Sequence, residues 1–209
     1  MAAPIMRVRG QGRPNVFFSD RGDASYIRSD MRLLSDFAEI RRTSFLARGW
    51  HALPMAFLRQ MLVCLRSMPG SDVVFVHFAG WNALLPLMFA RLFRKPSVLF
   101  LHGTDAASMP ELGYGQFRKW PLSWATAASL RMAGRIVVVD EALLRSTNTW
   151  SGSRVVEQGI RAFVPSLKTP ADVLPHGFDP DEWPMGDSER DIDVLTVGVG
   201  LGTPRIRRL

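Results

Sequence analysis

Residues 95–105 read Lys-Pro-Ser-Val-Leu-Phe-Leu-His-Gly-Thr-Asp, and the rest of the chain is interpreted from this stretch. Ser97 to Leu101 are apolar or small without alternation, which is typical of a strand buried on both faces of a parallel sheet. Ligands of open α/β sheets bind at the carboxyl ends of such strands. His102, Gly103, Thr104 and Asp105 are therefore candidate site residues. The alternative is an ordinary strand-to-helix loop, with Thr104 or Asp105 capping the helix.

The same strand-to-helix alternation extends in both directions from this stretch. It predicts α/β architecture, with a Rossmann-like parallel sheet flanked by helices and right-handed crossovers. Predicted strands cover 15–19, 38–45 (partly polar, suited to a sheet edge), 72–78, 97–101, 135–139 and 172–175. Predicted helices cover a segment from Ser25, then 54–68, 81–93, 116–132 and 142–147, while 154–166 is ambiguous. The Gly-rich stretch 106–115 predicts a lid or a loop that contacts an acceptor.

Composition indicates a globular protein that favours anionic partners. The chain has 209 residues, 47% of them hydrophobic, and 26 basic against 19 acidic residues give a net charge of +7. This balance favours nucleic acid, phosphorylated ligands or a membrane face. No aromatic-basic interleaving or reader motif supports nucleic acid. Four scattered histidines give no metal-ligand spacing, so no metal is expected.

The single cysteine and the N-terminal residues predict a cytoplasmic location. Cys64 has no possible internal disulfide partner, and its apolar helical surroundings predict a buried thiol. The first ten residues lack the apolar core of a secretory signal.

Two apolar stretches raise the question of a membrane. Residues 73–90 contain no charged side chain, but β-branched residues, a break at 79–82 and Pro86 favour strand, turn and helix over a membrane span. The apolar helix at 54–68 carries Arg59 and Arg66. It is either a buried crossover or a basic face lying on a membrane, which would make the protein peripheral.

Composition shifts divide the chain into four segments. Residues 1–14 are a basic leader, 15–179 the Rossmann-like N-terminal domain, and 180–191 a linker rich in Pro and acidic residues. Residues 192–209, with a predicted strand at 193–197, are the start of a second domain. Three glycines at 198–202 resemble a phosphate-binding turn without dinucleotide-fingerprint spacing.

Three features together resemble a known family. They are a strand ending in His102-Gly-Thr-Asp105, a strand at 136–139 followed by Asp140 and Glu141, and the segment 173–179, Val-Leu-Pro-His-Gly-Phe-Asp, before the linker. This order resembles the N-terminal half of the retaining glycosyltransferases of family 4, which have the GT-B fold. The sequence departs from that family at His176, where Asn is usual, and at Asp140, where Ser is usual.

The resemblance implies the acceptor-binding half of a glycosyltransferase of the hexosyltransferase type. Such an enzyme moves a sugar from a nucleotide-sugar to a glycan or lipid-linked acceptor and needs no cofactor or metal. The second domain binds most of the donor, so the resemblance implies a truncated chain that is inactive alone. The alternative function is a non-catalytic α/β binding module with a basic surface for a membrane or a protein partner.

The resemblance also implies roles for individual residues. His102 and Asp105 are the expected catalytic residues, with side chains facing an open cleft, and Gly22 would let the first loop approach the donor phosphates. The other expected substrate-binding residues are Gly103, Thr104, Asp140, Glu141, His176 and Gly177.

Overall fold

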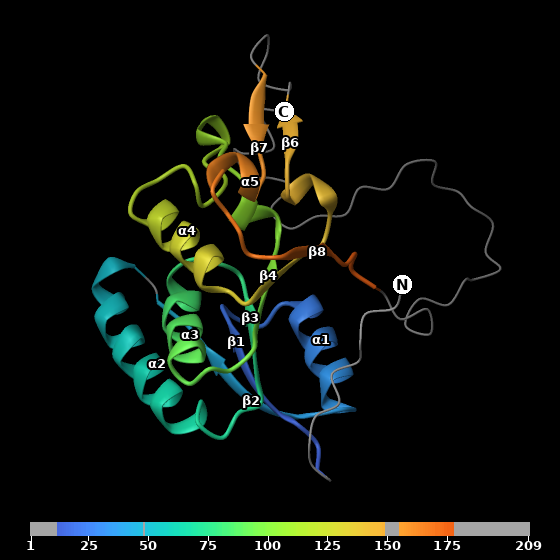
Figure 1. Ribbon diagram of the computed structural model, residues 1–209. Helices are drawn as coiled ribbons and strands as arrows, with labels where there is room; N and C mark the ends of the chain where they lie inside the picture. The colour runs from blue at the N-terminus through green and yellow to red at the C-terminus, as the bar shows by residue number, and fades with distance from the viewer. Residues whose placement is uncertain (1–11, 48, 149–154, 178–209) are drawn as a thin grey trace, which may run out of the picture.

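A computed structural model describes residues 12–47, 49–148 and 155–177 of the protein. Its centre is a six-stranded, wholly parallel sheet in the order β2-β1-β3-β4-β5-β8, drawn in Figure 1. The sheet strands are β1 (Asn15–Asp20), β2 (Glu39–Ser44), β3 (Val73–His77), β4 (Ser97–Leu101), β5 (Arg135–Val138) and β8 (Ala171–Val173). This confirms the predicted α/β, Rossmann-like sheet.

Helices cover both faces of the sheet. They are α1 (Ser25–Ser35), α2 (Leu53–Ser67), α3 (Trp81–Leu92), α4 (Leu122–Met132) and the short α5 (Ile160–Phe163). Helices α2, α3 and α4 lie side by side over one face, and α1 covers the opposite face (Figure 1). Each helix returns the chain to the start of the next strand, which is what parallel pairing requires.

Two hydrophobic clusters fill the space between the sheet and these helices. On the α2–α4 side, Leu99 and Leu101 of β4 are fully buried with Leu87 of α3. On the α1 side, Phe18 and Ile27 are buried together. Burying one such side chain contributes about 1.5–3 kcal/mol. Strand β4 lies between β3 and β5, and helices cover both faces of the sheet. This central position explains the uninterrupted apolar run of β4.

Two predicted helices differ from the structure. Helix α4 begins at Leu122, not at residue 116, because residues 116–121 form turns and Pro121 precedes the first helical residue. The helix predicted at 142–147 is wrong. A single 3-10 turn, Glu141–Leu143, is followed by β6 (Ser146–Asn148), which pairs antiparallel with β7 (Val156–Gln158) inside the stretch that was ambiguous.

The predicted domain divisions stay predictions. Most of the leader, the linker at 180–191 and the second-domain start at 192–209 lie outside the described residues. Within the part that is described, no helix is long and apolar enough to cross a bilayer. The uncharged stretch 73–90 forms β3 and most of α3, as the sequence favoured.

Candidate functional site

The carboxyl ends of neighbouring strands bring three polar side chains together. Asp20 ends β1, His77 ends β3, and His102 follows β4 directly. Strand register places His77 beside Phe100, so that the imidazole of His102 comes next to the imidazole of His77. Nδ1 of His77 lies 3.2 Å from Nε2 of His102. The sequence predicted His102 at this edge but missed its partner.

His102 is nearly enclosed by rings. Its side chain is 8% exposed, and the rings of Tyr26 and Phe78 have centroids 4.6 and 4.5 Å from its own. The ring of His176, from the segment after β8, stacks on it at 5.4 Å. The segment after β8 thus brings His176 against His102, while the substrate-binding role that the resemblance implies for His176 stays a prediction. Gly177 is the last described residue, and a Cβ there would meet nothing within 4 Å.

Burial keeps the two paired imidazoles neutral. It lowers the pKa of His102 to about 3, an effect that His77 and His176 strengthen. Burial also lowers the pKa of His77 to about 4, although the carboxylate of Asp20 acts in the opposite direction. At neutral pH the pair can exchange hydrogen bonds but carries no positive charge.

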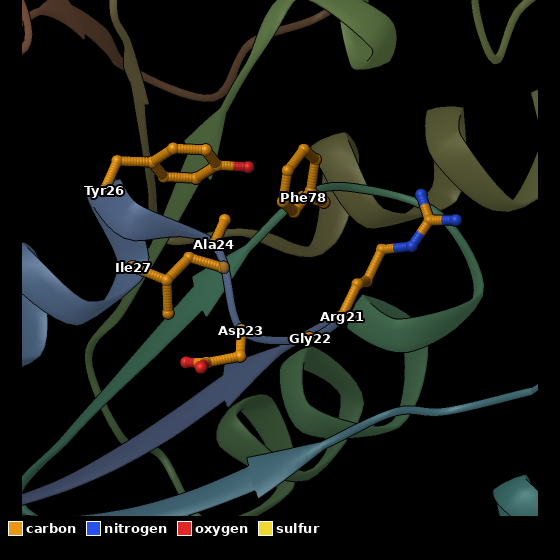
Figure 2. A pocket seen from close by; sticks show the side chains of 7 residues that line it. All are labelled: Arg21, Gly22, Asp23, Ala24, Tyr26, Ile27 and Phe78. Atoms are coloured by element: carbon orange, nitrogen blue, oxygen red, sulfur yellow. The ribbon is translucent and has the colours of Figure 1, made fainter. Parts of the chain in front are cut away.

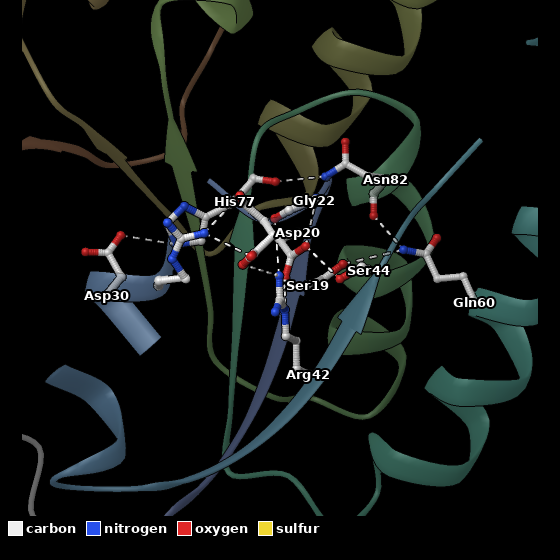
Figure 3. A network of polar contacts seen from close by, with 11 residues as sticks. Ser19, Asp20, Gly22, Asp30, Arg42, Ser44, Gln60, His77 and Asn82 are labelled. Atoms are coloured by element: carbon white, nitrogen blue, oxygen red, sulfur yellow. Dashed lines mark hydrogen bonds and ion pairs between the residues drawn. The ribbon is translucent and has the colours of Figure 1, made fainter. Parts of the chain in front are cut away.

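A carboxylate on α1 extends the pair into a chain of three groups. Nε2 of His77 lies 3.5 Å from the carboxylate of Asp30, as Figure 3 shows. A ring nitrogen facing a carboxylate carries the proton, so Nδ1 of His77 is left to accept from Nε2–H of His102. At the other end, the His102 ring accepts from the backbone N–H of Asp105 in a reciprocal capping box. The contacts of His102 with His77 and with Asp105 therefore both indicate the tautomer that carries its proton on Nε2.

The buried His102 and Asp105 do not face an open cleft, which corrects the expectation from the sequence for both residues. Asp105 is the more deeply buried of the two. Its side chain is fully buried, and its carboxylate accepts from the backbone N–H groups of His102 (3.2 Å) and Ala79 (3.3 Å). The Thr104 hydroxyl and the Gln116 amide also donate to it. Burial raises the pKa of Asp105 to about 7, against the lowering effect of these bonds. Asp105 thus ties the turn after β4 to the loop after β3.

Gly103 and Thr104 belong to the same turn and hold the loop 106–115 near it. A Cβ at Gly103 would lie 2.7 Å from the Tyr114 hydroxyl, so glycine lets Tyr114 approach. Gln116 donates its backbone N–H to the carbonyl of Thr104, and Met109 pairs with Tyr114 across the loop. The end of the predicted lid segment is therefore tied to the His102 turn through the Gln116–Thr104 backbone bond, and the Tyr114 hydroxyl packs close to Gly103.

The loop between β1 and α1 forms the wall of a cavity of about 410 Å³. Arg21, Gly22, Tyr26 and Phe78 are among its lining residues, as Figure 2 shows. The rings of Tyr26 and Phe78 also contact the His102 ring. Gly22 has a φ of +144°, and a Cβ there would meet nothing within 4 Å, so its backbone is open to the cavity.

A buried carboxylate fixes that loop in place. Asp20 is fully buried and accepts from the Gly22 N–H (2.9 Å), the Ser44 hydroxyl (2.8 Å) and Nε of Arg42 (2.7 Å). Arg42 reaches on to the Gly22 carbonyl at 3.2 Å (Figure 3). Sequence reasoning missed Asp20 and Arg42. Their signal was an acidic residue ending a buried strand and a basic residue in the neighbouring edge strand, where Arg42 is paired with Phe18 and so lies two positions before the partner of Asp20.

Asp140 and Glu141 lie after β5, and in the part of the chain that the structure describes they are not in contact with His102 or His77. Asp140 caps the following 3-10 turn, accepting from the N–H of Ala142 at 2.8 Å, and Glu141 is exposed. This is a helix-cap arrangement, which leaves a substrate role for the two residues a prediction. In the described ranges no group of three or more His, Cys, Asp or Glu side chains could hold a metal ion.

Comparison with known families decides the assignment that this geometry leaves open. Residues 9–162 match the profile of a family described as "Glycosyl transferase 4-like domain". The chain belongs to this family. No curated protein matches it.

The glycosyltransferase 4-like assignment covers most of the site. It includes β1 to β7, the β1–α1 loop, His77, His102 and Asp105. Strand β8 and His176 follow the matched region. The family therefore confirms the resemblance seen in the sequence, while the roles of individual residues stay predictions.

Proposed function

We propose that this glycosyltransferase 4-like domain is the acceptor-binding half of a retaining glycosyltransferase of the hexosyltransferase type. A nucleotide-sugar would be the donor and a glycan or lipid-linked molecule the acceptor, with a second domain holding most of the donor. The family match supports the reaction class. The observation that supports this location of the reaction is the cavity at the carboxyl edge of the sheet, two of whose lining residues, Tyr26 and Phe78, also contact the His102 ring.

The reaction breaks the bond between the anomeric carbon and a diphosphate oxygen, and that oxygen gains negative charge. An enzyme accelerates this step by placing positive groups and N–H donors where the charge develops. In this proposal the diphosphate lies toward Gly22 and the start of α1. Arg21 lines the same cavity, and the first N–H groups of α1 have no capping side chain at Ala24. No cofactor or metal is part of the proposal.

His102 would contact the transferred sugar, whose anomeric centre becomes oxocarbenium-like in the transition state. A neutral imidazole suits a sugar hydroxyl better than a cation would, because it can donate one bond without needing a counter-charge. The Nε2–H of His102 now faces His77. A substrate hydroxyl would have to replace His77 as its partner.

Substitution of His102 tests this role in the complete gene product. Transfer from UDP-glucose or GDP-mannose to an added acceptor extract would be measured for wild type and for His102→Ala. We expect kcat to fall by about 100-fold or more, the usual cost of losing one positioned catalytic group. The anomeric configuration of the product, read by NMR, tests retention.

Leu33→Ala is the matched control, since Leu33 is exposed on α1 and is not one of the residues that line the cavity. Its kcat should equal that of wild type. Equal rates for His102→Ala and wild type would remove His102 from the reaction, and absence of transfer from any nucleotide-sugar would contradict the proposed function.

For location we propose the cytoplasm. The one cysteine of the sequence, Cys64, is fully buried in the core, and burial raises its thiol pKa to about 12. Such a thiol is unreactive and suits a protein that does not depend on oxidative cross-linking.

A further inference from the structure

Helix α2 is apolar on its outer side as well as on its inner side. Its outer side exposes Met55 (68%), Leu58 (46%), Leu62 (51%) and Leu65 (48%), which we call the α2 stripe. Their spacing of three and four residues places them in one line along the helix. The inner side buries Cys64 in the core. A continuous exposed apolar stripe of this kind marks an interaction surface.

The helix layer that contains the α2 stripe has no acidic residue. Helices α2, α3 and α4 contain neither Asp nor Glu, whereas α1, on the opposite face of the sheet, contains Asp30. The layer's charged side chains are Arg59, Arg66, Arg91 and Arg131. Its partner is therefore expected to be anionic and also able to accept leucine and methionine side chains.

Tryptophans lie where the three helices of this layer begin. Trp50 precedes α2, Trp81 starts α3, and Trp124 is in the first turn of α4. The ring of Trp81 is 6.4 Å from each of the other two, and Trp50 and Trp124 are 66% and 57% exposed. Amphipathic indole rings of this kind favour the boundary between water and lipid.

We propose that the α2 stripe and its flanking arginines bind the surface of an anionic lipid bilayer. The leucines would enter the acyl boundary while Arg59 and Arg66 pair with lipid headgroups, as in other amphipathic helices that lie in the membrane plane. A nucleic acid would pair with the arginines but leave the stripe exposed to water. A second copy packed through the same face would bring like charges together.

Docking in this way has a consequence for the site. Helices of the layer begin at the carboxyl edge of the sheet, the edge that carries His102, and the exposed tryptophans mark those beginnings. Binding through them holds that edge close to the lipid headgroups. This favours a lipid-linked acceptor over a free glycan, a step that rests on the proposed function, whereas membrane docking itself does not.

Vesicle sedimentation of the 209-residue chain tests the proposal. Vesicles of equal parts phosphatidylcholine and phosphatidylglycerol are compared with phosphatidylcholine alone. Wild type should bind the anionic vesicles about tenfold more tightly or better, and Leu58→Gln/Leu62→Gln should weaken that binding about tenfold or more. Arg59→Glu/Arg66→Glu should abolish the preference for anionic vesicles.

The matched control is Leu33→Gln/Phe37→Gln, because these two side chains are also exposed (62% and 73%) but lie in and just after α1. This variant should bind like wild type. Circular dichroism melts verify that every variant is folded. Failure of wild type to sediment with anionic vesicles overturns the proposal, as does equal weakening by the control. So does an α2 variant that changes only the oligomeric state, which would assign the stripe to self-association.

Discussion

His77 and His102 each have ring nitrogens whose protonation is set by a fixed partner. Asp30 faces Nε2 of His77, and Nδ1 of His77 faces Nε2 of His102. We therefore expect both residues to be Nε2–H tautomers at pH 7. Long-range proton-nitrogen NMR of the imidazoles measures this directly, with the exposed His51 as internal comparison. An Nδ1–H tautomer for His102 would contradict the arrangement.

The lowered pKa of His77 makes stability depend on pH in a defined direction. Its folded pKa of about 4 lies below the unfolded value of 6.5, so its contribution is complete above pH 6.5 and is lost as pH falls toward 4. His77→Asn keeps an acceptor for His102 but cannot titrate. The free energy of unfolding of this variant should fall less steeply with decreasing pH, by at most about 1.4 kcal/mol per pH unit.

Denaturant unfolding of wild type and His77→Asn across pH 4–8 supplies the measurement. Asp105, whose raised pKa acts in the opposite direction between about 4 and 7, is common to both proteins and cancels in the difference. The two curves should run parallel above pH 7, where the imidazole is neutral in both states. Curves that stay parallel at every pH would show that His77 is not buried as described.

At the scale of elements, the conformation of the loop 106–115 depends more on Gly115 than on Gly113. Gly115 has a φ of +94°, and a Cβ there would overlap the carbonyl of Ala107, whereas a Cβ at Gly113 (φ +62°) would meet nothing within 4 Å. Gly113→Ala should cost about 1 kcal/mol, the usual penalty for a left-handed alanine. Gly115→Ala should cost at least about 2 kcal/mol, because the carbonyl must also move.

Thermal or denaturant unfolding measures both costs. Gly113→Ala is the control, since it isolates the backbone conformation from the steric overlap. Equal costs for the two substitutions would mean that the loop shifts freely away from Ala107. The turn that holds Asp105 and Gln116 would then not depend on this close approach.

The elements that were predicted correctly are those whose local sequence agrees with their packing. Strand β4 has an uninterrupted apolar run because strands flank it, and the polar β2 lies at the sheet edge where solvent reaches it. In residues 142–147 the local sequence and the packing disagree. Their propensity suits a helix, but pairing of Ser146–Asn148 with β7 decides the structure, and that pairing is not visible locally.

The sequence predicts single residues of the site but not the contacts between them. A polar residue directly after a buried strand, as at His102, is visible in the sequence. The contacts of His102 are not, because they depend on the register between β3 and β4 and on the place of α1, which brings Asp30 to His77. The burial of Asp105 was missed for the same reason, since its partner Ala79 lies in another loop.

At the scale of the whole molecule, strand order predicts a gradient of stability across the sheet. Strand β4 lies between β3 and β5 with buried side chains, whereas β2 and β8 are edge strands with largely exposed side chains. Hydrogen exchange should be slowest at Leu99 and Leu101 and faster by orders of magnitude in β8. Uniform protection in all six strands would contradict this gradient.

Among the described strands β8 pairs with β5 alone, and the segment after it brings His176 to the ring of His102. During synthesis on the ribosome, every other group of the site is made before residue 171. The imidazole stack therefore closes last, after the sheet has accepted its final strand. Until then a nascent chain lacks one of the rings that enclose His102, so the environment of this imidazole is finished only when the last strand of the sheet has been made.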